Sequence, residues 1–127
     1  MRRMYCAVCL ICLVLLFTAG AIAADKTLIK QNVDSIVKAI NKGKAPDSFN
    51  ANDYAPYAFI MKKNGVLVVH PSLAGESLKK KAPPVYKALM KSKSTGKWVD
   101  YVWKEKQKHS YVKTTVSGLI VGSGYSE

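Results

Sequence analysis

The spacing of hydrophobic residues predicts an amphipathic helix over residues 25–42. Apolar side chains recur there every three or four positions, which places them on one face of a helix. Asp25 at its start and Lys38 and Lys42 near its end suit the helix dipole, and Gly43 suits the left-handed position after a helix. The apolar positions are Leu28, Ile29, Val33, Ile36, Val37 and Ile40. Residues 43–54 have no sustained period and predict a loop.

From residue 57 the hydrophobic period changes to two, which is typical of strands. The apolar runs 57–61 and 66–69 flank the dipeptide Asn64-Gly65. Asn-Gly between two apolar runs predicts a hairpin, because both residues tolerate the positive φ of a tight primed turn. His70-Pro71 ends the second strand, since proline cannot donate a hydrogen bond to the sheet.

The rest of the chain predicts an irregular segment over residues 72–81, a short helix at about 84–93 that begins at the proline pair, and three further strands. The strands are expected at 97–104, 110–116 and 119–125, with a charged turn and Ser117-Gly118 between them. Together these elements predict an α+β fold, in which a five-stranded antiparallel sheet carries a long N-terminal helix and a short helix on one side.

The first 23 residues have the pattern of a secretory signal peptide. Arg2 and Arg3 precede an apolar run, and Ala21-Ile22-Ala23 is the small-x-small pattern that signal peptidase cuts. The apolar run covers about 13 residues, fewer than the roughly 20 that span a bilayer, so cleavage after Ala23 is favoured over a retained anchor. We therefore expect residues 24–127 to form one periplasmic or secreted domain.

That domain would be strongly basic and free of cysteine. All three cysteines and both arginines lie in residues 1–23, which leaves 18 lysines against 8 acidic side chains. Lysine lacks the planar fork that contacts bases bidentately, so sequence-specific nucleic-acid binding is disfavoured. The lysines either keep an exported protein soluble or attract small anions, anionic envelope polymers or acidic proteins.

Several separate motifs follow one another between Tyr54 and Tyr125. They are Phe59-Ile60, Asn64-Gly65, Val68-Val69-His70-Pro71, Gly75, the run from Gly96 to Trp103, Lys108, Ser110-Tyr111-Val112 and Gly122-Ser123-Gly124-Tyr125. Together they resemble the single-Cache family, the extracytoplasmic PAS-like sensor domains of bacterial chemoreceptors and histidine kinases. The resemblance implies a five-stranded sheet packed on a long N-terminal helix, with a pocket for small organic acids or related metabolites. The segment between Gly75 and Gly96 is shorter and richer in lysine than is typical of the family, so ligand identity does not carry over.

Aromatic and basic residues of the predicted strands are the candidates for this pocket. Tyr101 with Trp103, and Tyr111 with Lys113, share strand faces, which gives either an aromatic pocket wall or ordinary sheet packing. Lys108 by resemblance, or Lys113 by its position inside a strand, would meet a ligand carboxylate, because a buried ammonium needs an anion. The charged run over residues 104–108 also has the character of a solvated hairpin tip, which would leave Lys108 in solvent. The predicted ligand-binding residues are Tyr57, Phe59, His70, Tyr101, Trp103, Lys108, Tyr111 and Lys113.

His70 and the glycines of the last strand allow more than one role. His70 would donate a hydrogen bond to a ligand, report pH, or serve a structural purpose, and the last is the ordinary role of a histidine. No spacing of ligand side chains indicates a metal site, and no cofactor is expected. Gly122 and Gly124 lie in a strand, so they favour close approach of another backbone or a ligand over a phosphate loop.

These inferences predict an exported Cache-type binding protein for chemosensing, not an enzyme. It would hold a small anionic metabolite, a short carboxylate, in a cavity kept open beneath a lysine-rich cover. No second apolar segment follows the last strand, so a membrane receptor or histidine kinase is expected to transmit the signal. The alternatives are a basic periplasmic protein that binds an acidic polymer or protein, and a hydrolase that uses His70. A homodimer through the N-terminal helix is a further possibility, although packing on its own sheet accounts for the apolar stripe.

Overall fold

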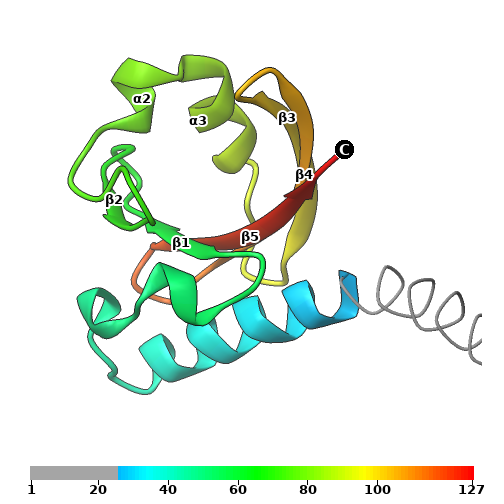
Figure 1. The fold of residues 1–127 in the computed structure, drawn as a ribbon. Helices are drawn as coiled ribbons and strands as arrows, with labels where there is room; N and C mark the ends of the chain where they lie inside the picture. Colours follow the sequence, from blue (N-terminus) through cyan, green and yellow to red (C-terminus); the bar gives the residue numbers. More distant parts are fainter. Residues whose placement is uncertain (1–25) are drawn as a thin grey trace, which may run out of the picture.

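The computed structural model describes residues 26–127, which are built around a five-stranded antiparallel sheet (Figure 1). The strands lie in the spatial order β2-β1-β5-β4-β3. Pairing of β1 with β5 joins the first hairpin to the last three strands. The predicted α+β class and the five-stranded antiparallel sheet are confirmed. The strand bounds are β1 Ala58–Met61, β2 Leu67–Val69, β3 Lys97–Trp103, β4 Lys106–Thr114 and β5 Ile120–Ser126.

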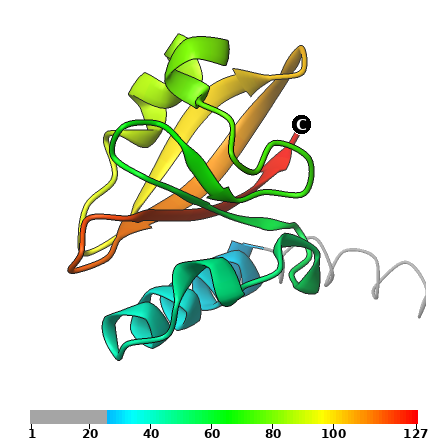
Figure 2. The same ribbon diagram turned by 90° about the vertical axis from the view of Figure 1, so that its left-hand side faces the viewer.

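Helices cover both faces of the sheet (Figures 1 and 2). A helix over residues 26–41 lies on one face, while α2 (Leu78–Lys81) and α3 (Pro83–Leu89) lie on the other. The prediction that the helices gather on one side is therefore wrong. None of the helices in residues 26–127 is long and apolar enough to cross a membrane. The predicted signal peptide lies outside the described residues, as does Asp25.

The sequence of β1 explains why both faces are covered. Ala58 and Ile60 pack in the cluster beneath the N-terminal helix, whereas Phe59 and Met61 pack in the cluster beneath α2 and α3. All four residues of this strand are buried. An unbroken apolar run is typical of a strand that is covered on both sides.

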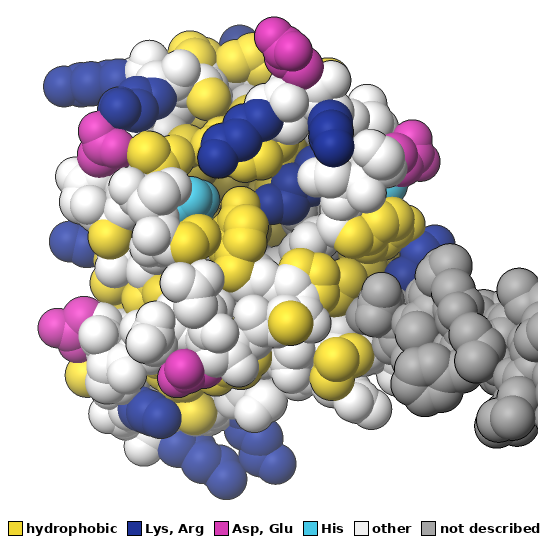
Figure 3. Space-filling model, in the orientation of Figure 1, with side chains coloured by type: hydrophobic (Ala, Val, Ile, Leu, Met, Phe, Trp, Pro, Cys, Tyr) yellow, Lys and Arg dark blue, Asp and Glu magenta, His cyan; other side chains and the backbone are white. Residues whose placement is uncertain are grey.

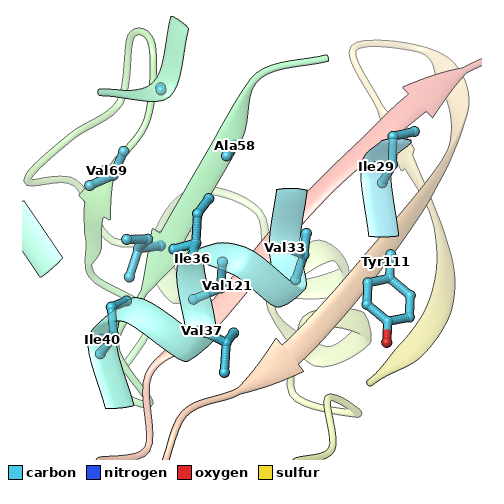
Figure 4. Close-up of a cluster of buried hydrophobic side chains, with 11 residues drawn as sticks. Ile29, Val33, Ile36, Val37, Ile40, Ala58, Val69, Tyr111 and Val121 are labelled. Carbon is cyan, nitrogen blue, oxygen red and sulfur yellow. The ribbon is translucent and has the colours of Figure 1, made fainter. Parts of the chain in front are cut away.

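The apolar stripe of the N-terminal helix forms the core of its face (Figure 4). Ile29, Val33 and Ile36 are at most 1% exposed, and they pack with Val121 of β5. Burial of each such side chain contributes about 1.5–3 kcal/mol. The segment after this helix contains two short 3-10 helices, η1 (Pro46–Ser48) and η2 (Ala51–Asp53), in the region predicted to be a loop.

The segment between β2 and β3 is more helical at its start than predicted. The Ser77 side chain accepts a hydrogen bond from the Lys80 N–H at 3.4 Å and caps α2, within the stretch expected to be irregular. The next helix ends at Leu89, four residues earlier than predicted. Hydrogen bonds from the Lys91 and Ser92 N–H groups to the carbonyls three residues earlier tighten the chain there.

The predicted hairpin between β1 and β2 is confirmed, but its turn is not the predicted one. Only Gly65 in this turn has positive φ, at 94°. The Lys62 carbonyl accepts from the Gly65 N–H at 2.9 Å, and the Lys62 N–H donates to the Val66 carbonyl at 2.8 Å. This pattern is that of a three-residue loop with a left-handed glycine, not a two-residue primed turn.

The turn between β3 and β4 is shorter than predicted. Lys104 and Glu105 both have positive φ, at 50° and 67°, and Trp103 pairs directly with Lys106. Two residues with positive φ define a two-residue primed turn. As a result, β4 begins at Lys106 and includes His109, both of which were assigned to the charged region before the predicted strand.

Candidate functional site

The pairing of β3 with β4 decides which predicted site residues lie together. Residues directly opposite each other in an antiparallel pair point to the same face. Tyr101 lies opposite Lys108, whereas Trp98 lies opposite Tyr111. Lys108 therefore shares the face of Tyr101 and Trp103, under α2 and α3.

Six of the eight predicted site residues line one pocket between this face and the α2–α3 segment. Four more lining residues, all apolar, were not predicted: Leu67 of β2, Leu78 of α2, and Val85 and Leu89 of α3. The spacing of four between Val85 and Leu89 was the signal that could have placed them on one helix face. The predicted residues in the lining are Tyr57, Phe59, His70, Tyr101, Trp103 and Lys108. Figure 3 shows a hollow in this face, where lysine and histidine side chains border hydrophobic surface.

Tyr111 and Lys113 do not line this pocket, so their placement on a common wall with Tyr101 and Trp103 is wrong. Tyr111 is buried in the cluster beneath the N-terminal helix. The Lys113 Nζ donates to Asp34 Oδ1 of that helix at 3.1 Å. The physical reason is the turn length, because a two-residue turn pairs odd-numbered with even-numbered positions. The expected five-residue turn over 105–109 would have paired odd with odd.

Lys108 is the central polar group of the pocket. Its side chain is buried, with 4% of the residue exposed, and Nζ donates a hydrogen bond to Tyr57 Oη at 2.8 Å. The same nitrogen lies 4.4 Å from the centre of the Tyr57 ring and 6.0 Å from that of Trp103. No carboxylate of residues 26–127 lies within ion-pair distance of it. Burial, together with the positive charge of Lys104, lowers the pKa of Lys108 to about 8.

His70 borders the same pocket as a neutral side chain. Its Nδ1 accepts hydrogen bonds from the backbone N–H groups of Ser72 at 3.1 Å and Leu73 at 3.0 Å. This arrangement places the ring proton on Nε2, which is then available to donate. Burial, together with the positive charges of Lys108 and Lys104, lowers the pKa of His70 to about 4.

A pair of hydroxyl groups lies deeper on the same face. Tyr101 Oη and Ser110 Oγ are 2.8 Å apart and buried. Burial raises the pKa of Tyr101, so its hydroxyl stays protonated. Because these two hydroxyls satisfy each other, they leave Lys108, His70 and Tyr57 as the groups that offer hydrogen bonds to a guest.

The pocket contains little free space. Its cavity volume is about 10 Å³, which is enough for about one water molecule. The expectation of a cavity held open beneath the lysine-rich cover is therefore wrong, because the aromatic and apolar side chains fill most of it. A larger guest requires movement of lining groups, and His70 and Trp103 are only partly buried.

The chemistry of the lining favours an anion over a cation. An ammonium and an imidazole N–H converge with a phenol on apolar walls, and the lining contains no carboxylate. Among residues 26–127, no group of three or more histidine, cysteine, aspartate or glutamate side chains is arranged to hold a metal ion. The arrangement also gives no nucleophile with an adjacent base and orienting acid.

The glycines of β5 permit close packing, as predicted. A Cβ at Gly122 would collide with the Phe59 ring, and a Cβ at Gly124 would collide with the His109 carbonyl and Ser110. Both glycines lie inside the strand. The predicted approach of another backbone is confirmed at Gly124, whereas Gly122 makes room for the Phe59 side chain.

Comparison with protein-family models and with curated proteins gave no match for this chain. The resemblance to the single-Cache family therefore stays a prediction that rests on the sequence motifs. The function is argued below from the pocket.

Proposed function

We propose that the protein is an exported binding protein of the Cache type that holds a small anion, a short carboxylate, against Lys108. The observation that carries this proposal is a lysine with 4% exposure and no acidic partner in the described chain. An ammonium taken out of water without an opposite charge is costly. A bound carboxylate supplies that charge.

The groups around Lys108 fit one carboxylate group. Lys108 and the Nε2–H of His70 are donors, and the Tyr57 hydroxyl, which accepts from Lys108, retains its own proton to donate. Charge-assisted hydrogen bonds of this kind are about twice as strong as neutral ones. The aromatic rings of Tyr57 and Trp103 and the apolar residues of α2 and α3 suit a short hydrocarbon tail.

The size of the cavity restricts the ligand. With room for about one water molecule, each additional carbon of the acid requires more displacement of the α2–α3 segment. We therefore expect acetate to bind more tightly than a longer or dicarboxylic acid. Displacement of α2 and α3 on binding would change the exposed surface offered to a membrane receptor or histidine kinase.

A second candidate function is supported by a different observation. Residues 78–93 carry six exposed lysines, Lys79, Lys80, Lys81, Lys87, Lys91 and Lys93, and no acidic residue. Only Lys81 among them forms an ion pair, with Glu76 at 2.7 Å. This surface fits an acidic polymer or an acidic protein without any small ligand.

Calorimetry of the purified protein with acetate in bicarbonate-free buffer tests the first proposal. A ligand at 100 times its Kd should also raise the free energy of unfolding by about 2.7 kcal/mol. Lys108→Met should abolish the heat of binding, whereas Lys106→Met, which removes an exposed lysine from the same strand, should leave it unchanged. A flat screen of small acids, amino acids and amines would remove the proposal.

A further inference from the structure

We propose that the Lys108 amine also binds carbon dioxide as a reversible carbamate, which makes the pocket a CO2 site. The proposal rests on a buried lysine whose side-chain nitrogen has a single hydroxyl partner and no carboxylate partner among residues 26–127. It goes beyond carboxylate binding and shares Lys108 with it.

The reaction is a balanced addition. The lone pair of the neutral Nζ attacks the carbon of CO2, an N–C bond forms, and one C=O electron pair moves onto oxygen. The nitrogen then releases one proton to water. One neutral amine and one CO2 thus give one carbamate anion and one proton, without an oxidant, a reductant or a metal.

The surroundings of Lys108 favour the neutral amine that this addition requires. Burial destabilises the ammonium form, and the nearby positive charge of Lys104 acts in the same direction, so that the pKa is about 8. An exposed lysine lacks both effects. Lysine side chains that are desolvated in this way are the ones that act as nucleophiles near neutral pH.

The same surroundings compensate the carbamate anion better than the ammonium. Conversion of Lys108 from a cation to an anion replaces its repulsion from Lys104 by attraction. The Tyr57 hydroxyl, already 2.8 Å from Nζ, and the Nε2–H of His70 can donate to the new oxygens. The Tyr101 hydroxyl is already hydrogen-bonded to Ser110. The lining residues of α2 and α3 are uncharged, so neither helix repels the negative charge.

The size of the cavity also favours CO2. The free volume of about 10 Å³ requires displacement of side chains for any guest beyond one water molecule. CO2 is uncharged and has three heavy atoms in a line, whereas acetate has four. It therefore needs less displacement of side chains than acetate or a longer acid.

Trapping of the carbamate followed by peptide mapping tests the proposal. The purified protein is equilibrated with 13C-labelled CO2, ethylated with a trialkyloxonium salt, digested and analysed by mass spectrometry. We expect the label on Lys108. At fixed dissolved CO2 the labelled fraction should rise at least about fivefold between pH 7 and 8.5, because the neutral amine becomes the major form across a pKa near 8.

Two variants and a competition separate this site from other amines. Lys108→Arg keeps a positive charge but cannot form the carbamate, so the label should disappear, whereas Lys106→Met should retain it. Saturating acetate should suppress the label if both guests use the pocket. Label confined to the N-terminal amine, or absent from Lys108 in the wild-type protein at pH 8.5, would overturn the proposal. The wild-type map does not depend on variant folding, and carboxylate binding is measured separately without CO2, so each proposal fails independently.

Discussion

Lys108 is the only buried lysine of residues 26–127, and its position depends on one pairing between two strands. A chain with 18 lysines gives no compositional reason to single it out. The sequence motif indicated it, while position inside a strand favoured Lys113 equally. The structure places Lys113 against Asp34 and Lys108 in the pocket, so the two side chains have opposite electrostatic environments.

The lowered pKa of Lys108 predicts that stability rises with pH in a mildly alkaline window. Its pKa is 10.5 in its ordinary state and about 8 in the folded protein. Between these values the unfolded chain binds more protons than the folded one, so the free energy of unfolding increases with pH. From pH 7.5 to 9.5 the gain should be about 2 kcal/mol in urea unfolding. Lys108→Met should show no such rise, and an equal rise in both proteins would contradict the assignment.

The lowered pKa of His70 predicts a loss of stability in acid. Its pKa falls from 6.5 to about 4 on folding, so the unfolded chain takes up a proton first as the pH drops through this range. The free energy of unfolding should therefore decrease from pH 6.5 to 4. The partly exposed His109 acts in a different range, because hydrogen bonds to Asp100 and Glu127 raise its pKa, so that its contribution to stability is lost as the pH rises above 6.5.

His70→Asn separates the two histidines. Asparagine offers an acceptor oxygen to the Ser72 and Leu73 N–H groups in place of Nδ1 and does not titrate. Chemical unfolding at pH 6.5 and 4.5 should show a smaller loss for this variant than for the wild-type protein. His109→Asn should lose about as much as the wild type between these pH values, because the raised pKa of His109 places its own change in stability above pH 6.5. A loss in His70→Asn as large as in the wild type would mean that the His70 ring does not control the acid response.

At the scale of elements, period and turn residues were enough to predict all five strands and the helix α3 in approximate form. Strand faces were not predictable across the β3–β4 turn, because Lys104 and Glu105 are not residues that usually adopt positive φ. An error in the length of that turn inverted the faces of β4, so Tyr111 and Lys113 were assigned to the wrong side. The four-residue helix α2 is too short for a periodic signal, and only Ser77 before it has the character of a cap.

The strain in this turn can be measured. Glu105 has a φ of 67°, a conformation that costs an ordinary residue roughly 1–2 kcal/mol and glycine much less. Glu105→Gly should therefore raise the free energy of unfolding by about 0.5–1 kcal/mol, after allowance for the greater freedom of glycine in the unfolded chain. Glu105→Ala removes the same charge but keeps the strain, so it should give no comparable gain. If both variants change stability equally, the charge and not the backbone is responsible.

At the scale of the whole molecule, the two layers that cover the sheet differ in what they can contact. The N-terminal helix buries its apolar stripe against the sheet (Figure 4). The α2–α3 layer both roofs the Lys108 pocket and carries the six exposed lysines of residues 78–93. A partner on this lysine surface and a guest in the pocket would therefore both contact the α2–α3 segment. The partner would contact the exposed lysines, whereas the guest would contact the buried Lys108.

Salt separates these two modes of binding in one protein. Exposed charges are screened over about 10 Å at 0.1 M salt and about 3 Å at 1 M, whereas a buried contact is screened much less. Binding of poly-glutamate to the lysine surface should weaken by at least about tenfold between 0.05 and 0.5 M sodium chloride. Acetate binding to Lys108, measured by calorimetry over the same range, should change by less than about threefold. Replacement of Lys79, Lys80 and Lys87 by glutamine should reduce only the first interaction, and Lys108→Met only the second. If acetate binding weakens as steeply as poly-glutamate binding and is lost in the surface variant, the anion site lies on the exposed lysines and not in the pocket.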